Sequence, residues 1–307
     1  MTAFEACKAA EAGIKKAHQN AQIVNLPMSD GGEGLVECIA HALPLTVHQV
    51  KVHGPLMTPV TACYAISPDK KTAYMEMAQA AGLTLVPKEK RNPMLTTTYG
   101  VGEMILDAIS KGCDHIIIGI GGSATCDGGK GMVDCLKEAA ARNNAVSETA
   151  ANEAAFIEAT AKEAVIKEIR VTIASDVNNP LCGENGAAHV FGPQKGATPE
   201  QVTMLDQRLR QFAIDTANAG IAPLSLMNAP GAGAAGGLGF ALMAYLKATM
   251  RSGIGLLLDL IEFDKKISNA DIILTGEGKS DRQTLMGKVA AGVLARAQKQ
   301  GLPCYLI

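Results

Sequence analysis

Four aspartates in this 307-residue sequence stand in glycine-rich loops, each of which follows a short apolar run. Glycine lets backbone amides approach a phosphate, and the N-terminus of a following helix favours negative charge. Phosphoryl transfer also needs carboxylates for Mg²⁺, a group that orients the nucleophile, and a cation for the developing charge. The sequence holds candidates for each part. The aspartates are Asp30, Asp127, Asp176 and Asp281, and the nearby cations are Lys195, Lys279, Arg282 and Lys288.

Asp176 is the strongest single candidate for a catalytic residue, because it closely follows an apolar strand pattern and precedes Asn178-Asn179-Pro180. A purely structural Asx turn explains that position equally well. Asp281 could likewise only cap the helix that carries Leu285. One glycine-rich turn is more often simple turn chemistry than a ligand site, but four such loops, each with an acid, favour a function.

Two of the loops resemble dinucleotide-binding patterns in part. Gly231, Gly233 and Gly236 spell GxGxxG, yet no strand pattern precedes them. Gly119-Ile120-Gly121 does follow a strand pattern, but no second strand with an acidic residue arrives about 20 residues later. An NAD-dependent oxidoreductase that uses the glycines near 119 or 231 therefore stays open as an alternative function.

The apolar pattern along the chain predicts an α/β fold that would position these loops. Helices are expected over residues 3–19, 35–42, 97–112, 199–219, 231–246 and up to 300, and most of 132–179 should be helical because it lacks glycine and proline. Strands are expected over 22–26, 46–53, 61–66, 72–77, 115–118, 168–174, 271–274 and 302–307. In open α/β sheets the loops at the carboxyl ends of strands gather into one crevice, so the four loops should meet.

The composition excludes several classes of protein. With 28 basic and 30 acidic residues and a net charge of −2, the chain has no electrostatic footprint for nucleic acid or an anionic membrane. Its longest apolar runs are far shorter than the roughly 20 residues of a membrane span. The eight cysteines form no CxxC pair, which is typical of reduced thiols in a cytoplasmic protein, and the six histidines show no metal-binding spacing.

Seven sequence blocks, spread over nearly the whole chain, resemble the glycerate kinase type I family in content and in order. They are DGGEG at 30–34, EMAQAAGL at 76–83, NPMLTTTYGVGEMI at 92–105, GIGGSATCDGG at 119–129, SDVNNPLCGENGAAHVFGPQKGA at 175–197, GAGAAGGLG at 231–239 and TGEGKSDRQTLMGK at 275–288. The resemblance implies phosphorylation of D-glycerate to 2-phosphoglycerate, with ATP and Mg²⁺. It also implies a Rossmann-like parallel-sheet domain and a second mixed α/β domain, with the active site in the cleft between them.

On that basis we expect residues 1–44, 92–168 and 262–307 to form the Rossmann-like domain, and 45–91 and 169–261 the second domain. Family members have a strand and a loop before the first helix and continue beyond residues 302–307, so we expect this sequence to be the interior of a longer enzyme. The oligomeric state stays open, with a homodimer as one candidate. No nucleic-acid or membrane partner is expected.

The resemblance also suggests roles for the candidate residues. Asp176 or Asp281 would orient or deprotonate the hydroxyl group, and Asp127 or Asp30 would hold Mg²⁺. Lys195 or Arg282 would neutralise the transferred phosphoryl group. ATP would contact a set of loop residues made up of Gly121, Gly122, Ser123, Gly276, Gly278, Lys279, Gly233 and Gly236. Besides the oxidoreductase, a catalytically silent metabolite-binding protein is the remaining alternative.

Overall fold

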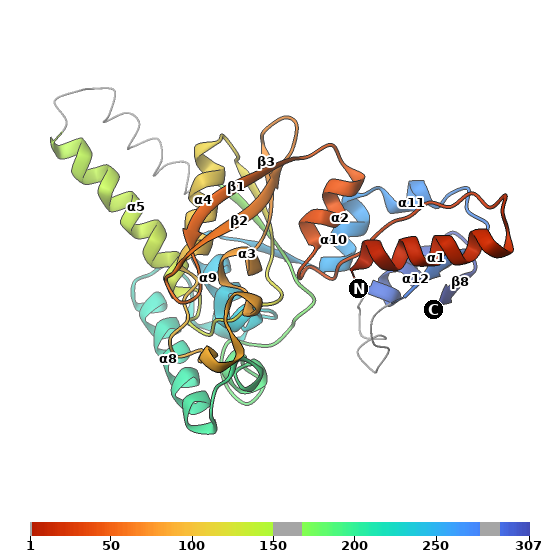
Figure 1. Cartoon of the computed structure of the whole chain (residues 1–307). Coiled ribbons are helices and arrows are strands. Elements are labelled where there is room, and N and C mark those ends of the chain that lie inside the picture. The colour runs from red at the N-terminus through yellow and green to blue at the C-terminus, as the bar shows by residue number, and fades with distance from the viewer. Residues whose placement is uncertain (1, 150–167, 277–288) are drawn as a thin grey trace.

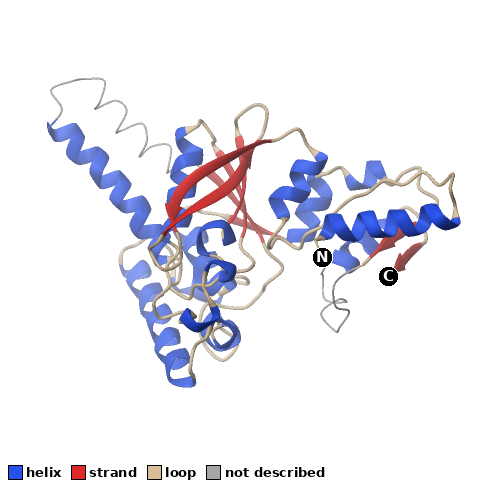
Figure 2. Cartoon of the chain, in the orientation of Figure 1, coloured by secondary structure: helices blue, strands red, loops and turns tan. Residues whose placement is uncertain are grey.

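The computed structural model describes residues 2–149, 168–276 and 289–307 and shows a mixed α/β architecture (Figure 1). A larger lobe contains a six-stranded sheet, and a smaller lobe contains a two-stranded sheet beside both chain termini (Figure 2). None of the helices in the described part of the chain combines the length and apolarity that a membrane span requires.

The large sheet has its strands in sequence order. They are β1 Thr46–His53, β2 Pro59–Ile66, β3 Thr72–Glu76, β4 His115–Gly119, β5 Arg170–Ala174 and β6 Thr249–Arg251. The first three strands form the antiparallel meander that the alternating pattern predicts, and β3 to β6 are parallel. The sequence pattern did not predict β6, which is only three residues long.

The register of the parallel strands aligns their carboxyl ends. Glu76 of β3 pairs with Gly119 of β4, Gly119 pairs with Ala174 of β5, and Ala174 pairs with Arg251 of β6. These four residues form one row across the sheet, and the next residue of each strand begins a loop. The segments that follow β3, β4, β5 and β6 therefore begin at a common edge of the sheet, as expected for a parallel α/β sheet.

Helices cover both faces of this sheet. On one face lie α4 Tyr99–Ser110, α5 Lys130–Thr149 and α9 Leu238–Tyr245, which share the largest apolar core with the sheet. The end of α5 extends away from the body (Figure 1). The remaining elements of the larger lobe are α3 Ala78–Ala81, α7 Ala187–Phe191 and α8 Pro199–Asn218, with 3-10 turns η1 Leu83–Leu85, η2 Lys88–Lys90, η3 Pro193–Lys195, η4 Leu224–Asn228 and η5 Ala234–Gly237.

The opposite face of the sheet packs on α2 Leu35–Ala42 and α10 Gly253–Leu260, since Tyr74, Ile117 and Ala174 belong to the same apolar cluster as residues of these two helices. The same cluster continues into the smaller lobe. That lobe is built from α1 Ala3–Ala17, α11 Phe263–Lys266, β7 Ile273–Thr275, α12 Val289–Lys299 and β8 Cys304–Leu306. The strands β7 and β8 pair in parallel, as the βα pattern of residues 271–307 predicts.

The strand expected over residues 22–26 is absent. This segment pairs with no neighbouring strand of the described residues, and Val24 is 70% exposed. The predicted domain boundaries stay a prediction. β4 lies within 92–168 and sits between β3 and β5, which apolarity alone did not define, because it predicts a buried strand without identifying its partners. The described elements of the smaller lobe come from both ends of the chain, namely α1 from the first and α11, β7, α12 and β8 from the second.

Candidate functional site

Three loops meet at the carboxyl edge of the large sheet. The loop at 27–34 enters between the others, where the backbone N–H of Gly121 donates to the carbonyl of Gly31 at 3.4 Å. Gly31 has φ +92°, and a Cβ there would lie 2.8 Å from the carbonyl oxygen of Ala174. The predicted convergence of the loops at 27, 119 and 175 is therefore confirmed, although no strand precedes the first of them.

Asp176 follows β5 and has two differently placed carboxylate oxygens. Its Oδ1 accepts a hydrogen bond from the backbone N–H of Gly253 at 3.1 Å, at the start of α10. Its Oδ2 is buried and has no hydrogen-bond partner among the described residues. Burial raises the pKa of Asp176, and the negative charge of Asp30 adds to that increase, while hydrogen bonding with Ser252, Gly253 and Ile254 opposes it. One oxygen is thus fixed by the fold, and the other is a buried acceptor without a hydrogen-bond partner among the described residues.

A cavity of about 420 Å³ opens beside this carboxylate. It is bounded by the ends of β5 and β6 and by the chain before α9. The residues that line it are Ser175, Asp176, Asn178, Pro230, Met250, Arg251 and Ser252. A volume of this size suits a small organic ligand.

Glu76 holds the end of β3 against α2. Its Oε1 accepts from the backbone N–H of Val36 at 2.8 Å, and its Oε2 accepts from the N–H of Gly34 at 3.2 Å. Glu76 is only 5% exposed, and burial raises its pKa, opposed by these two hydrogen bonds. The side chain thus caps the N-terminus of α2, where a carboxylate is favoured by the unpaired amides and the helix dipole.

Asp127 caps helices in the same way, and its role as a metal ligand stays a prediction. Its Oδ2 accepts from the N–H of Thr98 at 2.9 Å, from the hydroxyl of Thr98 at 2.8 Å and from the N–H of Gly131 at 3.1 Å. Its Oδ1 accepts from the N–H of Gly129 at 3.1 Å. Both oxygens are occupied at the starts of α4 and α5, which leaves the carboxylate engaged with protein donors.

Lys195 also turns toward the protein. The side chain is 3% exposed, and its Nζ donates at 2.7 Å to the Oγ of Ser123 and at 2.7 Å to the carbonyl oxygen of Thr125. Burial lowers the pKa of Lys195 to about 8. Both acceptors lie in the glycine-rich loop after β4. The ammonium is therefore bound to that loop, and its role at the transferred phosphoryl group stays a prediction.

The GxGxxG stretch before α9 is a packing feature. Gly233 and Gly236 are buried, and a Cβ on Gly233 would lie 2.1 Å from the carbonyl oxygen of Pro180. A Cβ on Gly236 would lie 2.0 Å from the carbonyl oxygen of Thr125. These glycines let three loops touch, so the prediction that they contact ATP, and the oxidoreductase alternative that used them, are not favoured.

The other predicted ATP contacts are distributed over two places. Gly121, Gly122 and Ser123 follow β4, where Gly122 is exposed with φ +74° while Ser123 is bound by Lys195. Gly276 is exposed at the end of β7 in the smaller lobe. The remaining candidates lie outside the described residues. They are Asp281, Arg282, Gly278 and Lys279.

The sequence pattern did not single out three residues of this edge, namely Glu76, Arg251 and Ser252. Ser252 precedes the apolar run of α10 and accepts from the N–H of Gly255 at 3.2 Å, a helix N-cap that was readable from the sequence. The two others depend on the pairing of strand ends, which a sequence alone does not define.

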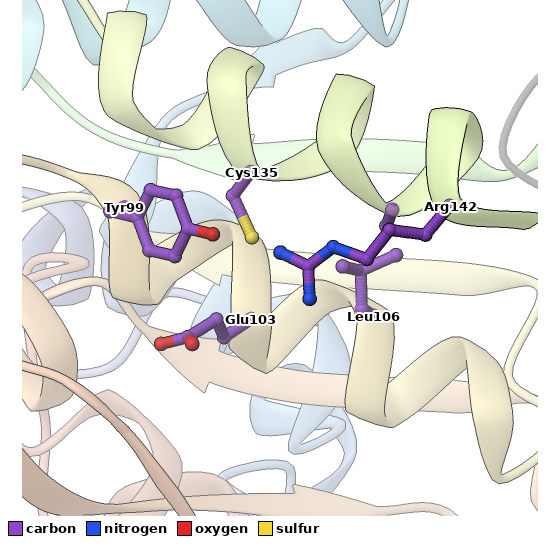
Figure 3. A pocket seen from close by; sticks show the side chains of 6 residues that line it. Tyr99, Glu103, Leu106, Cys135 and Arg142 are labelled. Carbon is purple, nitrogen blue, oxygen red and sulfur yellow. The ribbon is translucent and has the colours of Figure 1, made fainter.

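A second, smaller pocket lies between α4 and α5 and has a volume of about 230 Å³. Figure 3 shows Tyr99, Cys135 and Arg142 pointing into the space between the two helices. Tyr99 donates its hydroxyl to Glu138 at 2.8 Å, and this raises the pKa of Tyr99 to about 12. None of the lining residues belongs to the loops at the sheet edge, so the pocket is a separate crevice between helices.

Comparison with known proteins identifies the family. A model described as the glycerate kinase family matches residues 1–307. The chain is 44% identical to a glycerate kinase of Halalkalibacterium halodurans over 100% of this chain and 81% of that protein. It is 42% identical to glycerate 2-kinase of Escherichia coli strain K12, over 99% of this chain and 80% of that protein.

A solved structure described as that of a glycerate kinase 2 from Salmonella typhimurium LT2 has the same fold. It superposes with a TM-score of 0.80 at 38% sequence identity, covering 100% of this chain and 82% of the other. The chain therefore belongs to the glycerate kinase family.

Proposed function

We propose that this protein transfers a phosphoryl group from ATP to the 2-hydroxyl of D-glycerate and so forms 2-phosphoglycerate. Family membership supports the reaction class, and the E. coli relative is named a glycerate 2-kinase. The observation that carries the proposal for this chain is the Oδ2 of Asp176, a buried carboxylate oxygen without a hydrogen-bond partner among the described residues, beside a cavity of about 420 Å³.

Asp176 is well placed to orient the attacking hydroxyl. Its Oδ1 is fixed by the N–H of Gly253, so the carboxylate has a defined orientation at the edge of the cavity that Asp176 lines. A hydroxyl that donates to this carboxylate is aligned for attack; its proton passes to the carboxylate as the new O–P bond forms and the bond between the γ-phosphorus of ATP and the bridging oxygen breaks, so that ADP leaves. Positioning of this kind supplies much of the catalysis of phosphoryl transfer, for which a strong base is not required.

Asp30 is the carboxylate that fits a magnesium ion. It is exposed, its Oδ1 accepts from the N–H of Gly32 at 3.2 Å, and its charge raises the pKa of Asp176. Mg²⁺ is commonly held by one or two carboxylates together with phosphate oxygens and water. When bound beside Asp30, Mg²⁺ would neutralise negative charge on the phosphates of ATP and relieve the repulsion between the two acids.

The loop after β4 is proposed to receive the phosphates of ATP. Gly122 is exposed there with φ +74°, so the backbone at this position is open to a ligand. The N-termini of α2, α5 and α10 are occupied by carboxylates of the protein itself, so they do not serve as phosphate sites. Gly276, Gly278, Lys279 and Arg282 stay candidates for further contacts with ATP.

The direct test is an assay of the product. Purified protein is incubated with ATP, Mg²⁺ and D-glycerate, and enolase is added to convert 2-phosphoglycerate to phosphoenolpyruvate. We expect signal without a phosphoglycerate mutase, because 3-phosphoglycerate does not react with enolase. Absence of glycerate-dependent ATP consumption would reject the proposed function and favour a silent metabolite-binding protein. Tight NADH binding without ATP binding would instead favour the oxidoreductase.

The role of Asp176 is tested by Asp176→Asn, which keeps the shape but removes the charge. We expect kcat to fall at least about a hundredfold if the carboxylate contacts the reacting hydroxyl. Asp215→Asn is the matched control, because Asp215 is exposed on α8 and bonds only Gln211 among the described residues. Near-normal kcat for Asp176→Asn would remove this residue from the mechanism while leaving the assigned reaction intact.

A further inference from the structure

Arg251 ends β6 directly beside the proposed catalytic carboxylate. It pairs in register with Ala174, and its carbonyl accepts from the N–H of Ser175 at 3.1 Å. Asp176 follows Ser175, two residues beyond the end of β5. Because parallel strands lie side by side, these two charged side chains leave neighbouring strands at the same edge and line the same cavity. Arg251 is the cationic residue among those that line it.

The guanidinium of Arg251 is held from one side only. Its Nη2 donates to Oδ2 of Asp259 on α10 at 2.5 Å. Asp259 also pairs with Arg296 of α12, which reaches Asp264 at 2.5 Å. The orientation of Arg251 thus depends on a chain of ion pairs that continues into the smaller lobe.

Most of the N–H donors of the Arg251 side chain have no hydrogen-bond partner among the described residues. An arginine has five N–H donors in a planar fork. Apart from the bond to Asp259, no other hydrogen bond of this side chain occurs within residues 2–149, 168–276 and 289–307. The side chain is 47% exposed, so the free donors are accessible to a ligand.

The chemistry of a 2-hydroxy acid matches this arrangement. Its hydroxyl and its carboxylate are on adjacent carbon atoms, so a site that binds both needs an acceptor and a cation close together. The carboxylate of Asp176, which lines the cavity, is such an acceptor, and a guanidinium binds a carboxylate with two parallel hydrogen bonds. Lys195 is not available for this role, because its ammonium is bound to Ser123 and Thr125.

We propose that Arg251 binds the carboxylate of the substrate and so selects hydroxy acids, with Asp259 as the positioning residue that aims the guanidinium. The proposal rests on the proposed function, since it names the group that holds D-glycerate in that same site. The neutral amide D-glyceramide has the hydroxyl groups of glycerate without its charge. A substitution that weakens binding of D-glycerate but not of D-glyceramide therefore affects recognition of the carboxylate, whereas one that weakens binding of both changes the cavity in general.

The test compares Arg251→Met with the unaltered protein. Loss of charge-assisted hydrogen bonds should raise KM for D-glycerate about 10- to 100-fold. KM for ATP should stay within about twofold, and so should the inhibition constant of D-glyceramide, because neither ligand uses the lost interaction. Arg251→Lys keeps the charge and the partner Asp259 but lacks the fork, so its KM should be intermediate. Arg210→Met is the matched control, because Arg210 pairs with Asp206 on α8 and lines neither cavity.

The positioning role of Asp259 is tested with a double variant. Asp259→Asn alone should raise KM for D-glycerate by about three- to tenfold. It should add nothing to KM when Arg251 is already methionine, because no guanidinium is left to aim. An equal increase in both backgrounds would mean that Asp259 acts only through the stability of α10.

The outcomes separate this proposal from the proposed function. If the unaltered protein consumes ATP with D-glycerate but Arg251→Met keeps KM for D-glycerate within about twofold, the carboxylate role is wrong and the reaction stands. If KM for ATP rises and KM for D-glycerate does not, Arg251 binds phosphate and the proposal is overturned. If the unaltered protein shows no glycerate-dependent activity, the proposed function itself fails, whatever the variants do.

Discussion

Lys195 donates a hydrogen bond to Ser123 at 2.7 Å and so joins the turn after α7 to the glycine-rich loop after β4, across 72 residues of sequence. The same ammonium holds the carbonyl of Thr125 at 2.7 Å. A buried ammonium with two neutral acceptors is costly, which is why its pKa is lowered to about 8. This position fixes the shape of the loop that we propose for the phosphates of ATP.

We predict that Lys195→Met raises KM for ATP at least about tenfold while kcat falls much less. The substitution leaves the hydroxyl of Ser123 and the carbonyl of Thr125 unsatisfied, each at roughly 1–3 kcal/mol, and relief of the buried charge offsets part of that cost. Steady-state kinetics at saturating and limiting ATP distinguish the two parameters. A collapse of kcat with unchanged KM would mean that the ammonium reaches the phosphoryl group.

Ser123→Ala supplies the control for this prediction. If Lys195 acts by holding the loop, the double variant should be little worse than Lys195→Met alone, because Lys195→Met has already removed the bond to Ser123. Additive effects on KM would show that the two residues work independently.

We predict that Asp127→Asn destabilises the protein without changing its requirement for Mg²⁺. The amide cannot accept all of the hydrogen bonds that now reach the two oxygens from Thr98, Gly129 and Gly131, so unfolding should become easier by at least about 2 kcal/mol. Urea unfolding measures the loss, and the Mg²⁺ concentration for half-maximal activity should stay within about twofold.

Asp134→Asn is the control for this change. Asp134 lies on α5, the helix whose start Asp127 caps, but its side chain is 41% exposed and pairs with Lys130, so its loss should cost no more than about 0.5 kcal/mol. A large increase in the Mg²⁺ requirement of Asp127→Asn would restore the metal role that the sequence suggested.

Asp127 and Asp176 show where prediction from the sequence ends. Both are acids in glycine-rich loops after an apolar strand, and that context favoured a ligand role for each. Their difference lies partly in a partner that is distant in sequence, because Thr98 donates twice to Oδ2 of Asp127, whereas Oδ2 of Asp176 is buried without a hydrogen-bond partner among the described residues. Composition and spacing locate acids near a site. They do not show which carboxylate oxygens already accept hydrogen bonds from the protein.

The strands also show what the sequence pattern could predict and what it could not. The strands β3, β4 and β5 were predictable because each is a run of largely apolar residues, and the convergence of their loops followed from parallel topology. The strand β6 has only three residues, exposed at both ends, so no pattern marks it. Arg251 is the last residue of that strand, so the sequence pattern did not single it out as a residue that lines the cavity. The resemblance of seven blocks to one family predicted the reaction class, which the loops alone left as phosphate chemistry.

We predict that Gly236→Ala destabilises the protein even without nucleotide. Gly236 has φ +68°, and a Cβ there would lie 2.0 Å from the carbonyl oxygen of Thr125. The backbone strain costs about 1–2 kcal/mol, and the forced shift of the loop adds about 1–3 kcal/mol. Thermal and urea unfolding of the ligand-free protein measure the loss.

Gly220→Ala is closely matched to this substitution, because Gly220 has φ +69° and a methyl group added there would meet no atom of the described residues within 4 Å. It should therefore report the backbone strain alone. Equal destabilisation of both variants would contradict the packing role of Gly236. Weaker ATP binding by Gly236→Ala at unchanged stability would favour the nucleotide contact that the sequence suggested.

We predict that Glu76 makes the protein less stable as pH rises above about 4.5, the ordinary pKa of a glutamate. Burial raises its pKa in the folded protein, so the folded state holds the proton more tightly than the unfolded chain does. The free energy of unfolding then falls with rising pH, from the unfolded pKa up to the raised folded pKa, and levels off beyond it. The slope contributed by this group is at most about 1.4 kcal/mol per pH unit.

Glu76→Gln isolates this contribution, because glutamine has no proton to lose. The free energy of unfolding of the unaltered protein minus that of Glu76→Gln, from urea titrations between pH 4.5 and 7, should decrease as pH rises. A difference that increases with pH would mean that the hydrogen bonds from Gly34 and Val36 outweigh burial, so that the cap on α2 favours the ionised carboxylate.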